Sequence, residues 1–275
     1  MSGKDESSDL LICIRCHAHP RLIADTIDAV QMYTNPSATK LICAVDGRPQ
    51  VATKLERILP GHVYCSSQSW GWGAGLYGLL AESILWASSR WKFSHFLSID
   101  YDTLFIADDV DEFLLSLITD PKIGLIGEYN SRNVHWEKIF SDERRTIKKV
   151  LGSIPRGYRP GEGVQGGMML LTRTLLDALQ KGLMLQPPFA NAKEWTRLAD
   201  DHLITLFCRR CGLEIAQVAA GACVRWHLDR DPIGLEKSGI RVFHPTKIRP
   251  GYTDPNVEKT VRNYYRHLRG RNPLE

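Results

Sequence analysis

Apolar runs alternate with helical patterns along the first half of the chain. Strand-like runs cover residues 10–16, 40–45, 62–66 and 96–99. Between them, residues 20–33, 53–59 and 74–90 carry apolar side chains at helical spacing. This regular alternation of strand and helix predicts a mostly parallel sheet flanked by helices, in the α/β class.

The second half continues with a less regular order. Residues 110–118 repeat apolar side chains at helical spacing, with Asp108 or Asp109 as a cap. Two further strands are predicted at residues 122–127 and 166–171, and two helices at 172–181 and 200–211. Residues 128–163 lose periodicity and collect Arg, Lys, Gly and Pro, which predicts a long irregular loop or lid. We therefore expect one domain over residues 1–275, divided into a first half (10–127), this loop, a second half (164–250) and a C-terminal helix (254–271).

Composition narrows the class of protein only modestly. The chain has 275 residues, of which 43% are apolar and 24% charged, and this is typical of a globular protein. No apolar run approaches the ~20 residues of a membrane span, so no transmembrane segment is predicted. Seven cysteines are too few for a disulfide scaffold of this length and favour a reducing compartment, the cytoplasm. A net charge of +4 is too small to indicate a dedicated nucleic-acid binder.

Two carboxylates follow the apolar run at residues 96–99. Asp100 and Asp102 are separated by one residue, and apolar sequence resumes directly after them. Close carboxylates at the mouth of a buried strand repel each other, and a divalent cation relieves that repulsion. Their hard oxygens suit Mg²⁺ or Mn²⁺, which commonly bridge to substrate phosphates. Because α/β proteins bind ligands at the carboxyl ends of their strands, we favour a metal-diphosphate site over an ordinary solvated loop.

The order of these features resembles that of the GT-A type glycosyltransferases. The shared features are an α/β first half, Asp100-Tyr101-Asp102 at a strand end, a strand beginning Gly166-Gly167, an acidic pair at the head of a helix, and a late His-Pro-x-Lys. The resemblance extends from about residue 10 to residue 247, and it implies that residues 10–127 are the nucleotide-binding half and residues 164–250 the acceptor half. It implies a GT-A-like fold and transfer of a sugar from a nucleotide donor, UDP-linked, to a hydroxyl acceptor with Mn²⁺ or Mg²⁺.

The resemblance also assigns roles around the metal. Asp102 would ligate the cation directly, and Asp100 would lie beside it and face the donor ribose or sugar. His244 would complete the metal shell, and Lys247 would contact the diphosphate. His227 is a competing ligand.

Nucleotide binding is expected at the ends of the early strands. Residues 14–16 match the strand end that holds the nucleoside, which makes Arg15 and Cys16 candidates together with Tyr101. Asp46 could accept a hydrogen bond from the base, or it could simply form a turn with Gly47. Both interpretations of Asp46 stay open.

The acidic pair Asp200-Asp201 opens a predicted helix. Carboxylates are favoured at helix N-termini, so capping is one interpretation. In inverting members of the family, the second acid of such a pair is the base that deprotonates the acceptor, and Asp201 matches that position. The first acid is usually Glu, whereas this chain has Asp200.

Other motifs have simpler interpretations. Residues 73–78 satisfy G-x-G-x-x-G but follow the third strand and lack the expected acid, so we reject dinucleotide binding. The two C-x-x-C pairs lie on a predicted strand and a predicted helix, and buried thiols fit them better than zinc. Trp70 and Trp72 could shape a pocket or pack in the core. Trp195 could pack against an acceptor sugar or close a loop.

Two other functions remain possible for a chain with these features. A nucleotidyltransferase would share the sheet and the carboxylates, and a non-catalytic binding module would share the fold alone.

The C-terminal helix is predicted to pack on the domain through an apolar stripe formed by Val261, Tyr264, Tyr265 and Leu268. The arginines at 262, 266 and 269 would then be solvated. Alternatively, they would bind a polyanionic acceptor, such as DNA with a hydroxylated base or an anionic membrane.

Overall fold

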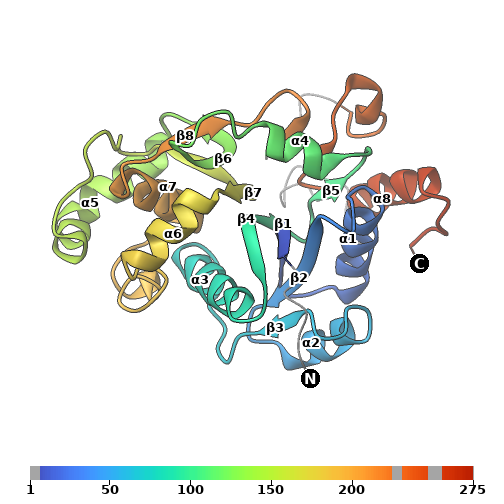
Figure 1. Cartoon of the computed structure of the whole chain (residues 1–275), viewed down its shortest axis with the longest axis horizontal. Coiled ribbons are helices and arrows are strands. Elements are labelled where there is room, and N and C mark those ends of the chain that lie inside the picture. The colour runs from blue at the N-terminus through green and yellow to red at the C-terminus, as the bar shows by residue number, and fades with distance from the viewer. Residues whose placement is uncertain (1–6, 225–230, 247–255, 275) are drawn as a thin grey trace.

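Alternate residues of the first strand, β1 (Ser7–Cys16), face two different hydrophobic cores. Leu11 and Cys13 lie in one core, whereas Ile12, Ile14 and Cys16 lie in the other. A strand that is buried on both faces belongs at the centre of a sheet with helices on each side. The computed structural model, which describes residues 7–224, 231–246 and 256–274, has this arrangement (Figure 1).

The helices and strands follow one another closely. The first half contains β1, α1 (Pro20–Met32), β2 (Thr39–Val45), α2 (Pro49–Glu56), β3 (Val63–Cys65), α3 (Ala74–Ser88), β4 (Lys92–Asp100), β5 (Leu104–Phe105), α4 (Val110–Ser116) and β6 (Ile123–Asn130). The second half contains α5 (Val134–Leu151), β7 (Gly163–Leu171), α6 (Arg173–Lys181), η1 (Ala192–Glu194), α7 (Asp200–Arg210), β8 (Glu214–Gln217), β9 (Ala222–Val224), η2 (Leu235–Ser238), β10 (Val242–His244) and α8 (Val257–Leu268). None of the described helices is long and apolar enough to cross a membrane.

The seven-stranded sheet has the order β3-β2-β1-β4-β7-β6-β8. The first four of these strands are parallel, β7 is antiparallel to both of its neighbours, and β8 is parallel to β6. The predicted mostly parallel sheet is confirmed. Because β7 runs the other way, its amino end lies at the same sheet edge as the carboxyl ends of β1, β2 and β4. Residues from all four strands can therefore meet there.

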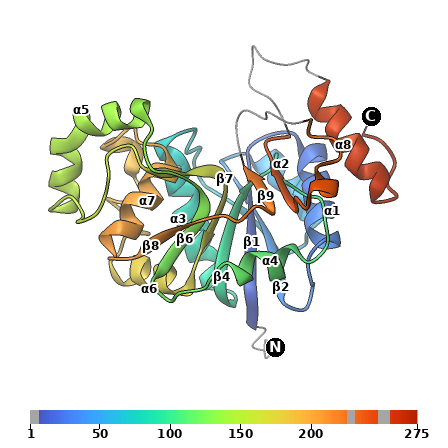
Figure 2. The ribbon, with the colours of Figure 1, turned by 90° about the horizontal axis from the view of Figure 1, so that it is seen from above.

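Each face of the sheet is covered by its own helices (Figure 2). Side chains of α3, α6 and α7, including Tyr77, Leu179 and Phe207, pack in one core. Side chains of α1 and α4, including Ile27 and Leu114, pack in the other. The two cores explain why the central strands are continuously apolar, since both faces of each strand are buried.

A second, three-stranded sheet with the order β5-β10-β9 carries the late part of the chain back to the main sheet. Phe243 of β10 lies opposite Leu104 of β5 in an antiparallel pair. Both residues join a small core with Val261 and Tyr265 of α8. Helix α8 lies beside α1 in both views (Figures 1 and 2).

The expected irregular loop at 128–163 is a wrong prediction for most of its length. Residues 134–151 form helix α5, whose first turn is capped by the side chain of Asn133 and whose end is followed by Gly152 at φ 77°. Only Phe140, Ile147 and Leu151 are buried in this helix. Its polar character reflects exposure on the outside of the molecule.

The expected solvated arginines of the C-terminal helix are also a wrong prediction. The Arg262 side chain is 0% exposed, and Arg269 is 4% exposed. Both form ion pairs with Asp25 of α1, and Arg269 also pairs with Asp28. These arginines are therefore occupied by carboxylates of the same chain and do not form an exposed stripe for a polyanion.

Candidate functional site

Asp100, Asp102 and His244 form a cluster at the carboxyl edge of the sheet. One ligand atom of each lies within 4.8 Å of the others. The Nε2 atom of His244 is 3.5 Å from Oδ1 of Asp102 and 3.8 Å from Oδ2 of Asp100. Asp102 and His244 are buried, whereas the Asp100 side chain is 28% exposed. Two carboxylate oxygens and one imidazole nitrogen are ligands that suit Mn²⁺. Asp100, Asp102 and His244 could therefore hold such an ion.

The pairing of β5 with β10 brings His244 to the two aspartates. Strand β5 begins two residues after Asp102, and the β5–β10 register places His244 next to that turn. The backbone N–H of Thr246 donates a 2.8 Å hydrogen bond to the carbonyl oxygen of Asp102. The chain after His244 is therefore tied directly to the Asp-Tyr-Asp turn.

Gly167 of β7 makes room for His244. A Cβ atom at Gly167 would lie 2.2 Å from Nδ1 of His244, closer than any real contact. A Cβ atom at Gly166 would meet nothing closer than 3.7 Å. The carbonyl oxygen of Gly167 accepts a 2.8 Å hydrogen bond from Oγ1 of Thr103, one residue beyond Asp102. The close approach at this glycine pair is thus made at Gly167, toward the candidate metal ligand.

Arg15 joins the cluster to the acidic pair. It lies opposite Asp100 in the parallel β1–β4 register, and Nη2 is 2.8 Å from Oδ1 of Asp100. Nη1 donates to Oδ2 of Asp200, and Nη2 also donates to the carbonyl oxygen of Gly166. The side chain is only 3% exposed. One buried guanidinium therefore pairs with two carboxylates of the site.

Asp200 and Asp201 both hold their protons more strongly than ordinary aspartates. Burial raises the pKa of Asp200 to about 6, although Arg15 opposes the shift. Burial also raises the pKa of Asp201 to about 7. Oδ1 of Asp201 accepts a 2.9 Å hydrogen bond from the N–H of His202, so this residue does satisfy one amide of the helix start. A carboxyl group with a pKa near neutrality is also suited to general-base chemistry.

Two cavities adjoin the cluster and share Arg15, Trp72, Leu76 and Asp100 in their walls. The first, which we call the β2-side cavity, has a volume of about 240 Å³ and is also lined by Cys16, His17, Asp46, Arg48, Ser69, Gly71, Leu79 and Tyr101. The second, the α7-side cavity, has a volume of about 220 Å³ and is also lined by Asn130, Asn133, Trp136, residues 163–167, Ala199, Asp200, Asp201 and His202. Asp100 therefore faces both cavities.

Solved structures resemble the fold of this chain over nearly its whole length. The bifunctional glycosyltransferase WbbM has a TM-score of 0.53 at 8% identity, covering 96% of this chain and 52% of that one, so our chain spans about half of its length. The galactosyltransferase LgtC, in complex with donor and acceptor sugar analogues, has a TM-score of 0.50 at 10% identity and coverages of 96% and 97%. The mannosyltransferase PcManGT of Pyrobaculum calidifontis, in complex with GDP-Man and Mn²⁺, has a TM-score of 0.50 at 15% identity and coverages of 94% and 70%. The chain has the GT-A fold. No protein-family model and no curated protein sequence matches it.

Within this GT-A fold, the predicted nucleotide-binding residues that the structure describes line the β2-side cavity. The Tyr101 ring packs edge-on against the His17 ring, with centroids 5.1 Å apart. The Asp46 carboxylate accepts hydrogen bonds from the backbone N–H groups of Trp70 and Gly71 at 2.5 and 3.1 Å. Asp46 therefore holds the loop that carries Trp72, and its contact with a base stays a prediction, as do the nucleotide contacts of Arg15, Cys16 and Tyr101.

The tryptophans named from the sequence take different places in the structure. Trp70 is buried in the core, whereas Trp72 is 76% exposed and lies in the wall of both cavities. Trp195 lines neither cavity, and its indole N–H donates to the carbonyl oxygen of Pro188. Trp136 was not anticipated, because it belongs to the unexpected helix α5.

His202 is a second residue that the sequence did not point to. Its Nδ1 atom is 2.7 Å from the carbonyl oxygen of Glu162, and burial lowers its pKa to about 4. It is therefore a neutral wall residue of the α7-side cavity, and a single His inside a helix carries no signal for that position. Lys247 and the competing ligand His227 lie outside the described residues.

Proposed function

We propose that this protein is a metal-dependent glycosyltransferase. It would transfer a sugar from a nucleoside diphosphate donor to a hydroxyl group, with Mn²⁺ or Mg²⁺ held by Asp100, Asp102 and His244. The observation that supports this most is the position of Asp100, which belongs to the ligand cluster and lines both cavities. Donor and acceptor could then meet at the cluster.

The β2-side cavity is the proposed donor site. Strand ends that face this cavity carry the residues that would hold the nucleoside, and the diphosphate would lie at the cluster. A divalent cation bound there would stabilise the negative charge that develops on the leaving diphosphate. We propose UDP-linked sugars as the first donors to test, followed by GDP-linked sugars, since PcManGT was solved with GDP-Man.

The α7-side cavity is the proposed acceptor site. Its indoles and the amides of Asn130, Asn133 and Gln165 provide flat apolar surface and hydrogen-bonding groups, which suit a hydroxyl-rich acceptor. Asp201 would accept the proton of the attacking hydroxyl. The acceptor oxygen would form the new bond to the anomeric carbon as the bond to the diphosphate oxygen breaks, and this would invert the anomeric centre. Asp200, held by Arg15, would keep the pair oriented.

A donor panel tests the proposal. Purified protein is incubated with nucleotide sugars and candidate acceptors, and released nucleoside diphosphate is measured with Mn²⁺ and with EDTA. We expect release to require the metal, to disappear in Asp102→Asn and to fall by at least ~10²-fold in Asp201→Asn. Asp177→Asn is the control, because Asp177 forms an exposed ion pair on α6. Release that is equal in EDTA would contradict the proposal, and pyrophosphate release from a nucleoside triphosphate would indicate a nucleotidyltransferase instead.

We also propose a reducing compartment, the cytoplasm. None of the seven cysteines, all of which lie in the described residues, is part of a disulfide, and four of them are buried. The buried thiols include Cys13, Cys16 and Cys208 of the two C-x-x-C pairs, which supports their interpretation as packing residues.

A further inference from the structure

The guanidinium group of Arg262, in the C-terminal helix, reaches the turn between the two candidate metal ligands. Its Nη2 atom donates a 2.9 Å hydrogen bond to the carbonyl oxygen of Tyr101, the residue between Asp100 and Asp102. Oγ1 of Thr26 in α1 donates to the same oxygen. The peptide group that separates the two ligands is therefore held by donors from two helices.

The third ligand is tied to the same helix through Glu258. Oε1 of Glu258 accepts hydrogen bonds from Nε of Arg262 at 3.0 Å and from Oγ1 of Thr246 at 2.9 Å. Thr246 lies two residues after His244, and its backbone N–H donates to Asp102. Arg262 and Glu258 thus contact both chain segments that carry candidate metal ligands.

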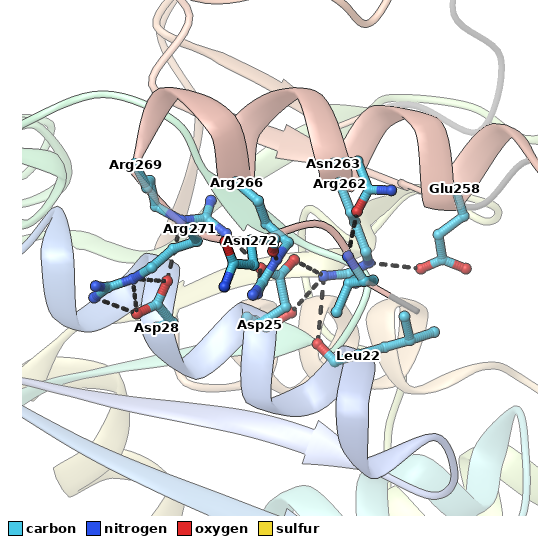
Figure 3. Close-up of polar contacts among 12 residues, drawn as sticks. Leu22, Asp25, Asp28, Glu258, Arg262, Asn263, Arg266, Arg269, Arg271 and Asn272 are labelled. Atoms are coloured by element: carbon cyan, nitrogen blue, oxygen red, sulfur yellow. Dashed lines mark hydrogen bonds and ion pairs between the residues drawn. The ribbon is translucent and has the colours of Figure 1, made fainter.

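Asp25 anchors this network to helix α1 (Figure 3). Its two carboxylate oxygens are paired with Arg262 at 2.8 Å, with Arg266 at 2.9 Å and with Arg269. Asp28, one turn later on α1, pairs with Arg269 and Arg271. A planar guanidinium has five N–H donors in a fixed fork, so Arg262 can contact Asp25, Glu258 and Tyr101 at once, and lysine cannot.

We propose that Arg262 and Glu258 are positioning residues for the cation site. They would fix the spacing of Asp100, Asp102 and His244, so that the cation site is complete only when α8 is docked on α1. This inference rests on the proposed function, in which these three residues bind a metal ion. Groups that orient metal ligands without touching the metal typically change metal affinity by 10–100-fold when they are removed.

Arg266 provides a matched control. It comes from the next turn of α8 and pairs with the same aspartate, but none of its hydrogen bonds or ion pairs among the described residues reaches the Asp-Tyr-Asp turn. Arg262→Lys and Arg266→Lys therefore both weaken the docking of α8, and only the first removes a bond to Tyr101. Thr246→Val tests the other branch, because it removes the bond to Glu258 and leaves the arginines untouched.

The experiment is a calorimetric titration of each folded variant with Mn²⁺ alone, accompanied by thermal melting. We expect Arg262→Lys to bind Mn²⁺ at least about tenfold more weakly than the wild type, Thr246→Val to weaken binding several-fold, and Arg266→Lys to stay within about twofold. If Arg262→Lys does not fold, Thr246→Val and Arg266→Lys decide the question.

Two results would overturn the positioning role. One is wild-type Mn²⁺ affinity in both Arg262→Lys and Thr246→Val. The other is an equal loss of affinity in Arg262→Lys and Arg266→Lys, because helix docking alone would then account for the effect. A folded wild type that binds no Mn²⁺ would instead contradict the metal centre of the proposed function, so the two failures are distinguishable.

Discussion

Arg15 and Asp100 face each other on neighbouring parallel strands, and their side chains form an ion pair of 2.8 Å in which the arginine is buried. The same guanidinium also forms an ion pair with Asp200. This single cation therefore compensates a carboxylate of the candidate metal cluster and a carboxylate of the acidic pair. The electrostatics of the two cavities, both of which Arg15 lines, are coupled through it.

Replacing Arg15 should be costly for stability. Arg15→Met would leave Asp100 and Asp200 without their buried partner, and the free energy of unfolding should fall by ~3–5 kcal/mol in a urea titration. Arg173→Met is the control, since Arg173 and Asp177 form an exposed pair within one helix, and it should cost less than ~1 kcal/mol. Equal losses in the two variants would argue against a special electrostatic role for Arg15.

The two adjacent glycines of β7, Gly166 and Gly167, should respond very differently to a methyl group. In Gly167→Ala the new Cβ would collide with His244, so we expect the Mn²⁺ affinity to fall by at least about tenfold. In Gly166→Ala the new Cβ has room, and the Mn²⁺ affinity should stay within about twofold. Titration of both proteins with Mn²⁺ measures the difference. Unchanged affinity in Gly167→Ala would mean that His244 is not a ligand.

The rate of sugar transfer should depend on the ionisation of Asp201. A base acts in its deprotonated form, and burial raises the pKa of Asp201 to about 7. Turnover at saturating substrate should therefore rise with pH up to an apparent pKa near 7 and then level off. Asp201→Asn should lower turnover by at least ~10²-fold and remove this inflection. A wild-type profile that is flat between pH 5.5 and 8.5, with chemistry rate-limiting, would contradict Asp201 as base.

The Asp201 carboxyl group should also make the stability of the folded protein depend on pH. The pKa of Asp201 is raised above its value of 3.8 in an unfolded chain, so the folded state retains this proton to higher pH. Its contribution to stability is fully present below pH ~4 and is lost as the pH rises through about 7. The melting temperature of Asp201→Asn minus that of the wild type should therefore be larger at pH 8 than at pH 4.5.

Melting curves at the two pH values test this linkage, with Asp177→Asn as the exposed control. If the difference between Asp201→Asn and the wild type is the same at both pH values, the carboxyl group has an ordinary pKa in the folded protein.

The first half of the fold could be predicted because its pattern is simple. Strands β1 and β4 are apolar on both faces, and the helices between them have clear spacing. The direction of β7 could not be predicted, because the run from Met168 to Leu171 is buried on both faces and carries no period. Helix α5 was missed because only three of its residues are buried, too few to outweigh its charged positions.

The residues of the candidate metal cluster could be named from the sequence, whereas most contacts that hold them in place could not. Asp100, Asp102 and His244 were identified from motif order, and the structure brings them together. The pair of Arg15 with Asp100 depends on strand register, which the sequence does not reveal. The burial of Arg262 depends on Asp25, 237 positions earlier, and charges on a helix face resemble a solvated surface until their partner is known.

In the proposed function, Asp102 binds a metal ion that in turn holds a nucleoside diphosphate. The most direct test measures the thermal stability of wild type and Asp102→Asn with UDP and with GDP, in Mn²⁺ and in EDTA. A diphosphate at 100 times its Kd should stabilise the wild type by ~2.7 kcal/mol, and this gain should require Mn²⁺ and be absent in Asp102→Asn. A nucleotide-induced shift of equal size in EDTA, or one that persists in Asp102→Asn, would contradict the account.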